Sequence, residues 1–166
     1  MSNQNYQITL KNHLTFLWPC IIANCLIIYF YYLIFEKSEI NLLIILLFLS
    51  IFIVNILPVL LIHIQYFLTN RNMLFKIDSL NKKIEYSQNG IIKKLDFSEI
   101  NRLISFRSYG YRSWYLFEAY EYLKIITNEG DEILITCLLI PDARDRFEGL
   151  LKIRAEEKFR LLPFAK

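Results

Sequence analysis

The chain of 166 residues has few of the residues on which enzymes and metal sites depend. Its four glycines are isolated, which excludes phosphate-binding loops and dinucleotide fingerprints. Its three cysteines, Cys20, Cys25 and Cys137, form no Cys-x-x-Cys pair and fit a reducing compartment. The only histidines, His13 and His63, lie in or beside long apolar stretches without an evident third ligand, so a shared metal site is the weaker alternative to polar interfacial roles. We therefore expect no catalytic residues, cofactor or metal.

Charge is scarce in the first 69 residues. Only Lys11, Glu36, Lys37 and Glu39 are charged there, whereas the rest of the chain carries the whole net charge of +3. This asymmetry predicts a chain in two parts, one in a membrane and one in the cytosol. A net charge of +3 is too small to indicate a nucleic-acid partner.

Two long uncharged runs, residues 14–35 and 40–64, predict a transmembrane helical hairpin over residues 14–64. A helix over the first run would be roughly 33 Å long, enough to cross a bilayer core. A buried core helix is the alternative, but two such runs are rare in soluble proteins. A cleaved signal peptide is disfavoured because the second run follows at once, after the loop at residues 36–39.

Basic residues near the ends of the spans predict the orientation of the hairpin. Lys11 precedes the first span, and basic residues from Arg71 onward follow the second, whereas the loop at residues 36–39 has one lysine and two glutamates. By the positive-inside rule, we expect both termini in the cytoplasm and the loop outside. Residues 1–13 would then be a cytoplasmic N-terminal segment, and residues 70–166 a cytoplasmic domain.

Polar and helix-breaking residues inside the spans are few. Asn24 and Asn55 fall at nearly equal depth in an antiparallel hairpin, so we expect an interhelical hydrogen bond between their amides. Contact of these amides with a membrane partner is the alternative. Pro58 lies deep in the second span and should kink it near Val54.

After residue 69 the pattern changes to short alternating runs that are typical of β-strands. The Asn89-Gly90 dipeptide predicts a two-residue hairpin turn, which sets Ile84 opposite Leu95. A three-residue turn at residues 128–130 would form a second hairpin, in which Ile125 faces Ile133. The predicted strands cover residues 72–78, 83–88, 91–97, 102–108, 113–118, 119–128 and 132–137.

The end of the chain predicts one amphipathic helix over about residues 142–159. Phe147 and Leu151 would bury one side of it against the sheet. Seven antiparallel strands followed by one helix is the order of a pleckstrin-homology (PH)-like barrel. The expected fold is therefore an α+β membrane protein, with a two-helix hairpin followed by a PH-like seven-stranded antiparallel barrel or sandwich that the C-terminal helix caps.

Two stretches carry a resemblance to a known family. They read YFLTNRNMLFKIDSLNKKIEYSQNGIIKKLDFSEINRLISF and YLKIITNEGDEILITCLLI, and residues 96–100 match a short turn after the third strand. Residues 66–140 resemble the bacterial PH-like domains, especially those of the YcxB-like proteins, which carry two N-terminal transmembrane helices. The resemblance implies the fold and two N-terminal spans. Together with the distribution of basic residues, it leads us to expect a place in the bacterial inner membrane, with both termini in the cytoplasm.

One segment combines the residue types that dominate binding hot spots. It begins at Arg107 and combines arginine, tyrosine and tryptophan around Gly110. Its alternatives are a structural role, with Trp114 in the core or against the membrane, and a contact with lipid headgroups. The candidates for partner binding are Arg107, Tyr109, Tyr111, Arg112, Trp114 and Tyr115.

Five lysines are the candidates for lipid headgroups: Lys76, Lys82, Lys83, Lys93 and Lys94. Their spacing is incomplete for specific inositide binding, and Asp78 lies among them, so weak attraction to anionic lipid is the expectation. The leading function is that of a non-enzymatic, membrane-anchored module that binds a protein, as an accessory subunit of a membrane complex or as an immunity protein that neutralises a toxin. The alternative is an anionic-lipid sensor tethered by the hairpin.

Overall fold

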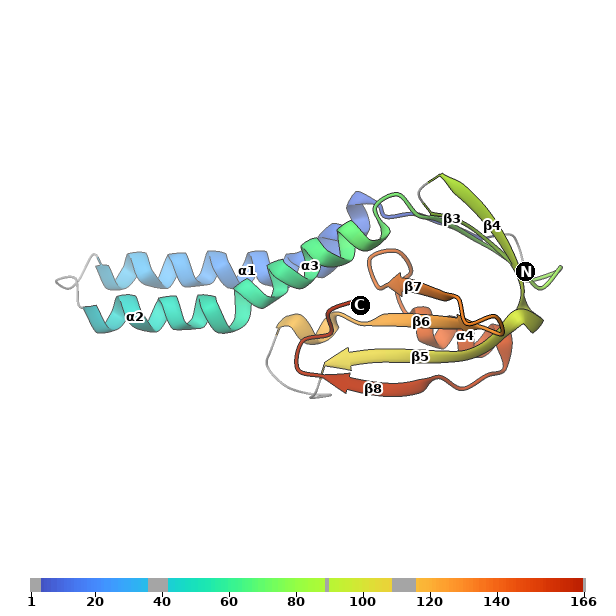
Figure 1. Cartoon of the computed structure of the whole chain (residues 1–166). Coiled ribbons are helices and arrows are strands. Elements are labelled where there is room, and N and C mark those ends of the chain that lie inside the picture. The colour runs from blue at the N-terminus through green and yellow to red at the C-terminus, as the bar shows by residue number, and fades with distance from the viewer. Residues whose placement is uncertain (1–3, 36–41, 89, 109–115, 166) are drawn as a thin grey trace.

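The computed structural model describes residues 4–35, 42–88, 90–108 and 116–165. A long helical hairpin projects from one end of a β-rich domain (Figure 1). By length and composition, two helical stretches could cross a membrane, Leu10–Leu33 and Ile45–Asn70. The predicted loop at residues 36–39 lies outside the described residues.

The first arm of the hairpin is the helix α1 (Leu10–Phe35), and the second arm has three parts. These are the helix α2 (Leu42–Ile51), the π-helical turn η1 (Phe52–Ile56) and the helix α3 (Leu57–Asn70). In η1 the Leu57 amide donates to the Phe52 carbonyl oxygen. Pro58 cannot donate to the Val54 carbonyl and its ring would clash there, which explains the irregular turn. The predicted irregularity near Val54 is therefore present, and the arm changes direction there (Figure 1).

The described residues of the domain form eight strands in two four-stranded sheets. The first sheet has the order β1-β2-β3-β4, and the second has the order β7-β6-β5-β8. The strands are β1 (Gln4–Tyr6), β2 (Leu74–Asp78), β3 (Lys83–Gln88), β4 (Ile91–Asp96), β5 (Ile100–Ser108), β6 (Tyr122–Thr127), β7 (Glu132–Thr136) and β8 (Glu156–Arg160).

Both predicted hairpins are confirmed. Ile84 faces Leu95 across β3 and β4, and Ile125 faces Ile133 across β6 and β7. Gly90 and Gly130 have φ values of 80° and 90°, which glycine adopts without a Cβ clash. Local turn chemistry and the alternation of apolar residues thus set both registers.

The predicted seven-stranded barrel is wrong in strand number and in closure. β1 comes from the N-terminal segment and pairs with β2, so that segment is part of the first sheet. The predicted strand at residues 113–118 lies partly outside the described residues, and its described part begins the 3-10 helix η3 (Leu116–Ala119). Among the described strands, no pairing joins the two sheets, so the domain is an open two-sheet arrangement.

The predicted C-terminal helix is shorter than expected. The helix α4 (Ala143–Leu151) ends at Lys152, whose left-handed φ of 60° terminates it. The Glu148 carboxylate then accepts the Ala155 amide at 2.8 Å and directs the chain into β8. β8 runs parallel to β5, with Arg160 opposite Ser108.

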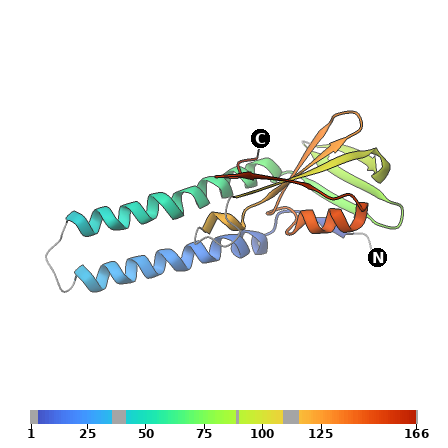
Figure 2. The same cartoon turned by 90° about the horizontal axis from the view of Figure 1, so that it is seen from below.

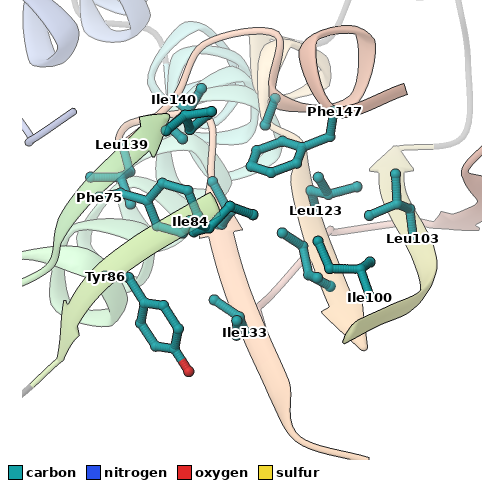
Figure 3. Packing of buried hydrophobic residues seen from close by; sticks show 14 of the residues in the cluster. Phe75, Ile84, Tyr86, Ile100, Leu103, Leu123, Ile133, Leu139, Ile140 and Phe147 are labelled. Atoms are coloured by element: carbon teal, nitrogen blue, oxygen red, sulfur yellow. The ribbon is translucent and has the colours of Figure 1, made fainter. Parts of the chain in front are cut away.

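Between the sheets lies an apolar cluster that we name the sheet core. Figure 3 shows Phe147 of α4 reaching between the sheets, and its ring meets the Phe75 ring edge-on at 5.9 Å. Phe147 is fully buried, as predicted, whereas Leu151 is only partly buried. The buried members are Met73, Phe75, Ile77, Ile84, Tyr86, Ile100, Leu103, Leu123, Ile125, Ile133, Ile135, Leu139, Ile140, Ala143, Phe147 and Ala155.

Candidate functional site

The hairpin and the domain meet at a second cluster, which we name the junction core. The 3-10 helix η3 contacts α1, η1 and α3, and it lies between the two arms in Figure 2. The cluster is rich in aromatic residues, and the Tyr66 ring lies 5.7 Å from Tyr120 and 6.2 Å from Tyr122. Its buried members are Cys20, Ile56, Val59, Ile62, Tyr66, Ile104, Phe106, Phe117, Tyr120, Tyr122, Ile126, Cys137, Leu138 and Ala165.

A chain of hydrogen bonds crosses the junction core. Nδ1 of His13 in α1 lies 2.8 Å from Nε2 of His63 in α3, and Nδ1 of His63 lies 2.8 Å from the Tyr120 hydroxyl. A neutral imidazole has one donor and one acceptor nitrogen, so two neutral histidines and a tyrosine can satisfy one another. His63 is 6% exposed and Tyr120 is fully buried. Both arms of the hairpin are thereby bonded to the domain.

The two histidines, which the sequence places near the same end of the hairpin, are joined by a hydrogen bond. Both ring nitrogens of His63 are engaged in hydrogen bonds, so neither offers a free lone pair to an ion. Over the part of the chain that the structure describes, no group of three potential metal ligands occurs. The two histidines therefore join helices.

The buried Asn70 at the end of α3 fixes the edge of the second sheet. Its Oδ1 accepts the amide and the hydroxyl of Thr136 at 2.9 and 2.8 Å. Its Nδ2 donates to the carbonyl oxygen of Leu134 at 2.9 Å. The side chain thus satisfies polar groups of β7, which is an edge strand of the sheet that the described residues form, and it locks α3 to that sheet.

The C-terminal tail is tied to the same helix. The Gln65 amide donates to the Ala165 carbonyl at 2.8 Å and accepts the Ala165 amide at 3.0 Å. The Tyr66 hydroxyl donates to the Pro163 carbonyl at 2.6 Å. On the other arm, the Asn12 amide donates to the Leu138 carbonyl at 2.7 Å. Each arm therefore has its own polar attachment to the domain.

Burial changes the acid–base behaviour of the domain side of the junction core. It raises the pKa of the Cys137 thiol and of the Tyr120 hydroxyl well above their ordinary values. Both groups therefore stay neutral near pH 7. A thiol held in this form is a poor nucleophile, so Cys137 has a packing role.

Of the predicted partner-binding residues, the structure describes Arg107. Its Nε donates to the Glu121 carboxylate at 2.8 Å, between β5 and the start of β6, and both side chains are mostly buried. Arg107 lies near the end of β5 that faces the hairpin (Figure 1). The other candidates, Tyr109, Tyr111, Arg112, Trp114 and Tyr115, lie outside the described residues, and the role of the segment stays a prediction.

The five predicted headgroup lysines spread over the first sheet and its turns. Lys83 pairs with Asp96 at 3.6 Å. Lys93 pairs with Asp131 at 3.4 Å, which raises the pKa of Lys93. In the strand register, Glu85 lies between Lys76 and Lys94, and Lys82 occupies the turn after β2. Acidic residues thus alternate with these lysines.

The predicted intramembrane pair of asparagines is not joined by a hydrogen bond among the described residues. The Asn24 amide donates to the Cys20 carbonyl oxygen of its own helix at 2.9 Å. Asn55 lies in the π-helical turn of the other arm and is partly exposed. The amide of Asn24 is satisfied without a second helix.

Sequence reasoning missed the residues that hold the junction together. Asn70 and Gln65 look like ordinary polar residues that end an apolar run, and Tyr120 looks like one aromatic residue among many. One signal was available, because His63, Gln65 and Asn70 are polar residues in a stretch long enough to cross a membrane. Such residues need partners.

Comparison with known proteins agrees with this architecture. A family model described as "PH domain" matches residues 5–144, a range that runs from β1 through both arms of the hairpin to the start of α4. No curated protein matches the chain. PH-like domains are in general non-catalytic binding modules, and they commonly bind lipids or proteins. Because the match covers most of the chain, this protein belongs to the PH domain family.

Proposed function

We propose that the chain is a membrane-anchored PH-like module that binds a protein partner at the bacterial inner membrane. Under this proposal it acts either as an accessory subunit of a membrane complex or as an immunity protein that neutralises a toxin. The observation that carries the proposal is a helical hairpin with two long uncharged runs, largely uncovered and fixed by buried hydrogen bonds to a domain of a binding family.

Exposure of the helices supports the membrane anchor. Buried core helices of soluble proteins pass the same test of length and composition, but here only 6% and 18% of an apolar 18-residue part of the two stretches is buried. The residues left uncovered include large apolar side chains such as Ile28, Tyr32 and Leu47, which are 59–66% exposed. A bilayer would cover them at no cost in unpaired backbone groups, because the helices satisfy their own.

The rigid attachment supports a positioning role for the anchor. His13, His63 and Asn70 bond the arms to the domain, so the anchor also sets how the domain faces the membrane. A module held in this way presents the same surface to any partner. Such preorganisation lowers the entropy lost on binding.

The segment that begins at Arg107 is the proposed partner surface. It combines arginine, tyrosine and tryptophan, which give large contact areas with few rotatable bonds. Arg107 itself is held by Glu121 at the end of a central strand of the second sheet. The second sheet would therefore hold Arg107, the start of this segment, at the end of the domain that faces the hairpin (Figure 1).

The test is affinity capture of the tagged full chain from detergent-solubilised membranes, followed by measured binding of the captured partner. Arg107→Ala, Tyr111→Ala and Arg112→Ala are compared with Arg154→Ala, an exposed arginine before β8 that serves as the control. At least one of the three should weaken binding by more than about 1 kcal/mol. Tyr111→Ala and Arg112→Ala should leave the melting temperature unchanged, whereas Arg107→Ala should lower it because the Glu121 carboxylate loses its partner. Parent-like binding by all three would place the interface elsewhere.

Lipid sensing by the domain is the alternative function. Two of its five lysines are paired with aspartates, and Glu85 separates two others, so their combined field on an anionic surface is reduced. We therefore place protein recognition first.

A toxin gene beside this one would favour the immunity role, and a transporter or secretion operon would favour the accessory role.

A further inference from the structure

Helix α3 is apolar on all sides, although the domain covers only one of them. Val59, Ile62 and Tyr66 are fully buried on the covered side. On the uncovered side Leu61, Ile64 and Leu68 are 49%, 55% and 53% exposed. A helix on the surface of a soluble domain carries polar residues on its outer side. The outer side of α3 therefore needs an apolar environment of its own.

This uncovered side continues the apolar surface of the rest of the hairpin. No charged residue occurs between residues 40 and 70. The second arm runs from Leu42 to Asn70 without a charged residue and measures roughly 40 Å at about 1.5 Å per residue, whereas a bilayer core is about 30 Å thick. The apolar part of the hairpin is longer than the core it would cross. The excess lies at the level of the domain, where α3 packs against β7 and η3.

The domain exposes apolar side chains at the end that faces the hairpin. Leu161 follows β8 and is 72% exposed, and Phe159 in β8 is 44% exposed. Figure 1 shows the chain after β8 turning on the side of the domain nearest the hairpin. The Ser108 hydroxyl donates to the Leu161 carbonyl at 3.2 Å, and the tail beyond is tied to α3 through Ala165. These bonds fix the backbone around Leu161, whose side chain stays exposed.

We propose that the outer side of α3 and the Phe159–Leu161 segment form one lipid-facing surface, so that this end of the second sheet rests in the interfacial layer of the bilayer. The proposal rests on the membrane anchor proposed above. Lipid is the occupant because the outer side of α3 continues the spans and because the second arm is longer than a bilayer core is thick. Large apolar residues at this level are typical of membrane interfaces.

Depth measurement by spin labelling tests the surface. The full chain, with its three cysteines replaced by alanine, carries one nitroxide at Leu46, Leu68, Leu161 or Leu80 in vesicles of phosphatidylethanolamine and phosphatidylglycerol. Leu80 is the matched control, because it is 77% exposed but lies in the β2–β3 turn, far from the hairpin. We expect the ratio of oxygen to nickel-chelate accessibility to be several-fold higher at Leu68 and Leu161 than at Leu80.

The outcomes separate this surface from the anchor itself. Lipid-like values at Leu46 with water-like values at Leu68 and Leu161 would overturn the surface and leave the anchor intact. Water-like values at Leu46 would overturn the anchor. Protection of Leu68 and Leu161 from both reagents, with spin–spin broadening between copies, would show that a second copy covers the surface, and would overturn lipid as its occupant.

Discussion

The sheet core and the junction core are held together in different ways. The sheet core is built almost wholly from aliphatic residues and phenylalanine, and its ring contact between Phe75 and Phe147 has no polar component. The junction core contains three tyrosines and two cysteines. Hydrogen bonds cross it between residues that are distant in the chain: His13 and His63 are 50 positions apart, and Asn12 and Leu138 are 126 positions apart. Apolar packing closes the domain, whereas directional bonds decide how the domain sits on its hairpin.

The largest expected effect is on the sheet core. Phe147→Ala removes a fully buried ring from between the sheets and should lower the free energy of unfolding by roughly 3–5 kcal/mol. Leu151→Ala, at a partly buried position of the same helix, should cost clearly less. Urea unfolding of the full chain in detergent measures both. Equal losses would contradict the central place of Phe147.

Asn70→Ala breaks the largest polar contact of the junction core. It leaves the Thr136 amide and the Leu134 carbonyl without their partner, and a buried unpaired group costs about 1–3 kcal/mol. We expect a loss of roughly 2–4 kcal/mol in urea unfolding. Asn5→Ala, at an exposed position of β1, is the control and should change stability by less than about 0.5 kcal/mol. A control-sized loss for Asn70→Ala would mean that apolar packing alone holds the junction.

The buried thiol of Cys137 predicts a pH dependence. Its pKa is raised on folding above the ordinary value of 9.0, so the unfolded chain loses this proton first as pH rises. The contribution to stability is complete below about pH 9 and is lost above it, with a slope of about 1.4 kcal/mol per pH unit. Melting temperatures measured from pH 8 to pH 10 should therefore fall. Cys137→Ala should flatten this slope, and an unchanged slope would remove Cys137 as its source.

The smallest expected effect is on the surface. Lys83→Ala removes an ion pair with Asp96 in which both side chains are more than half exposed. Such pairs contribute about 0–1 kcal/mol, so stability should change little, and added salt should reduce the change further. A loss as large as that of Asn70→Ala would contradict the distinction between surface and junction contacts.

Contacts between neighbouring segments were predictable from the sequence. The β3–β4 hairpin follows from Asn89-Gly90 and the alternation around it, and the break in the second arm follows from Pro58. β8 was missed because residues 142–159 have helical spacing, and only the pairing with β5 makes Glu156–Arg160 a strand. β1 was missed because three polar and aromatic residues carry no signal without β2 beside them.

The candidate site was predictable only in its parts. The sequence indicates that His13 and His63 lie at one end of the hairpin, and the structure brings them within hydrogen-bonding distance. The sequence places Tyr120 inside a predicted strand over residues 119–128, whereas Tyr120 lies between η3 and β6. Contacts of η3 with both arms bring it to the junction. Asn70 pairs with a strand 66 positions away, a distance that local patterns do not reach.

One labelling experiment tests the anchored orientation most directly. Single cysteines are introduced at Ser38 and at Ser79 in a chain without native cysteines, and cells are treated with a membrane-impermeant thiol reagent. The account predicts that Ser38→Cys reacts in intact cells, because the loop lies outside, and that Ser79→Cys reacts only after the membrane is permeabilised. Labelling of Ser79→Cys in intact cells, or of Ser38→Cys only after permeabilisation, would contradict it.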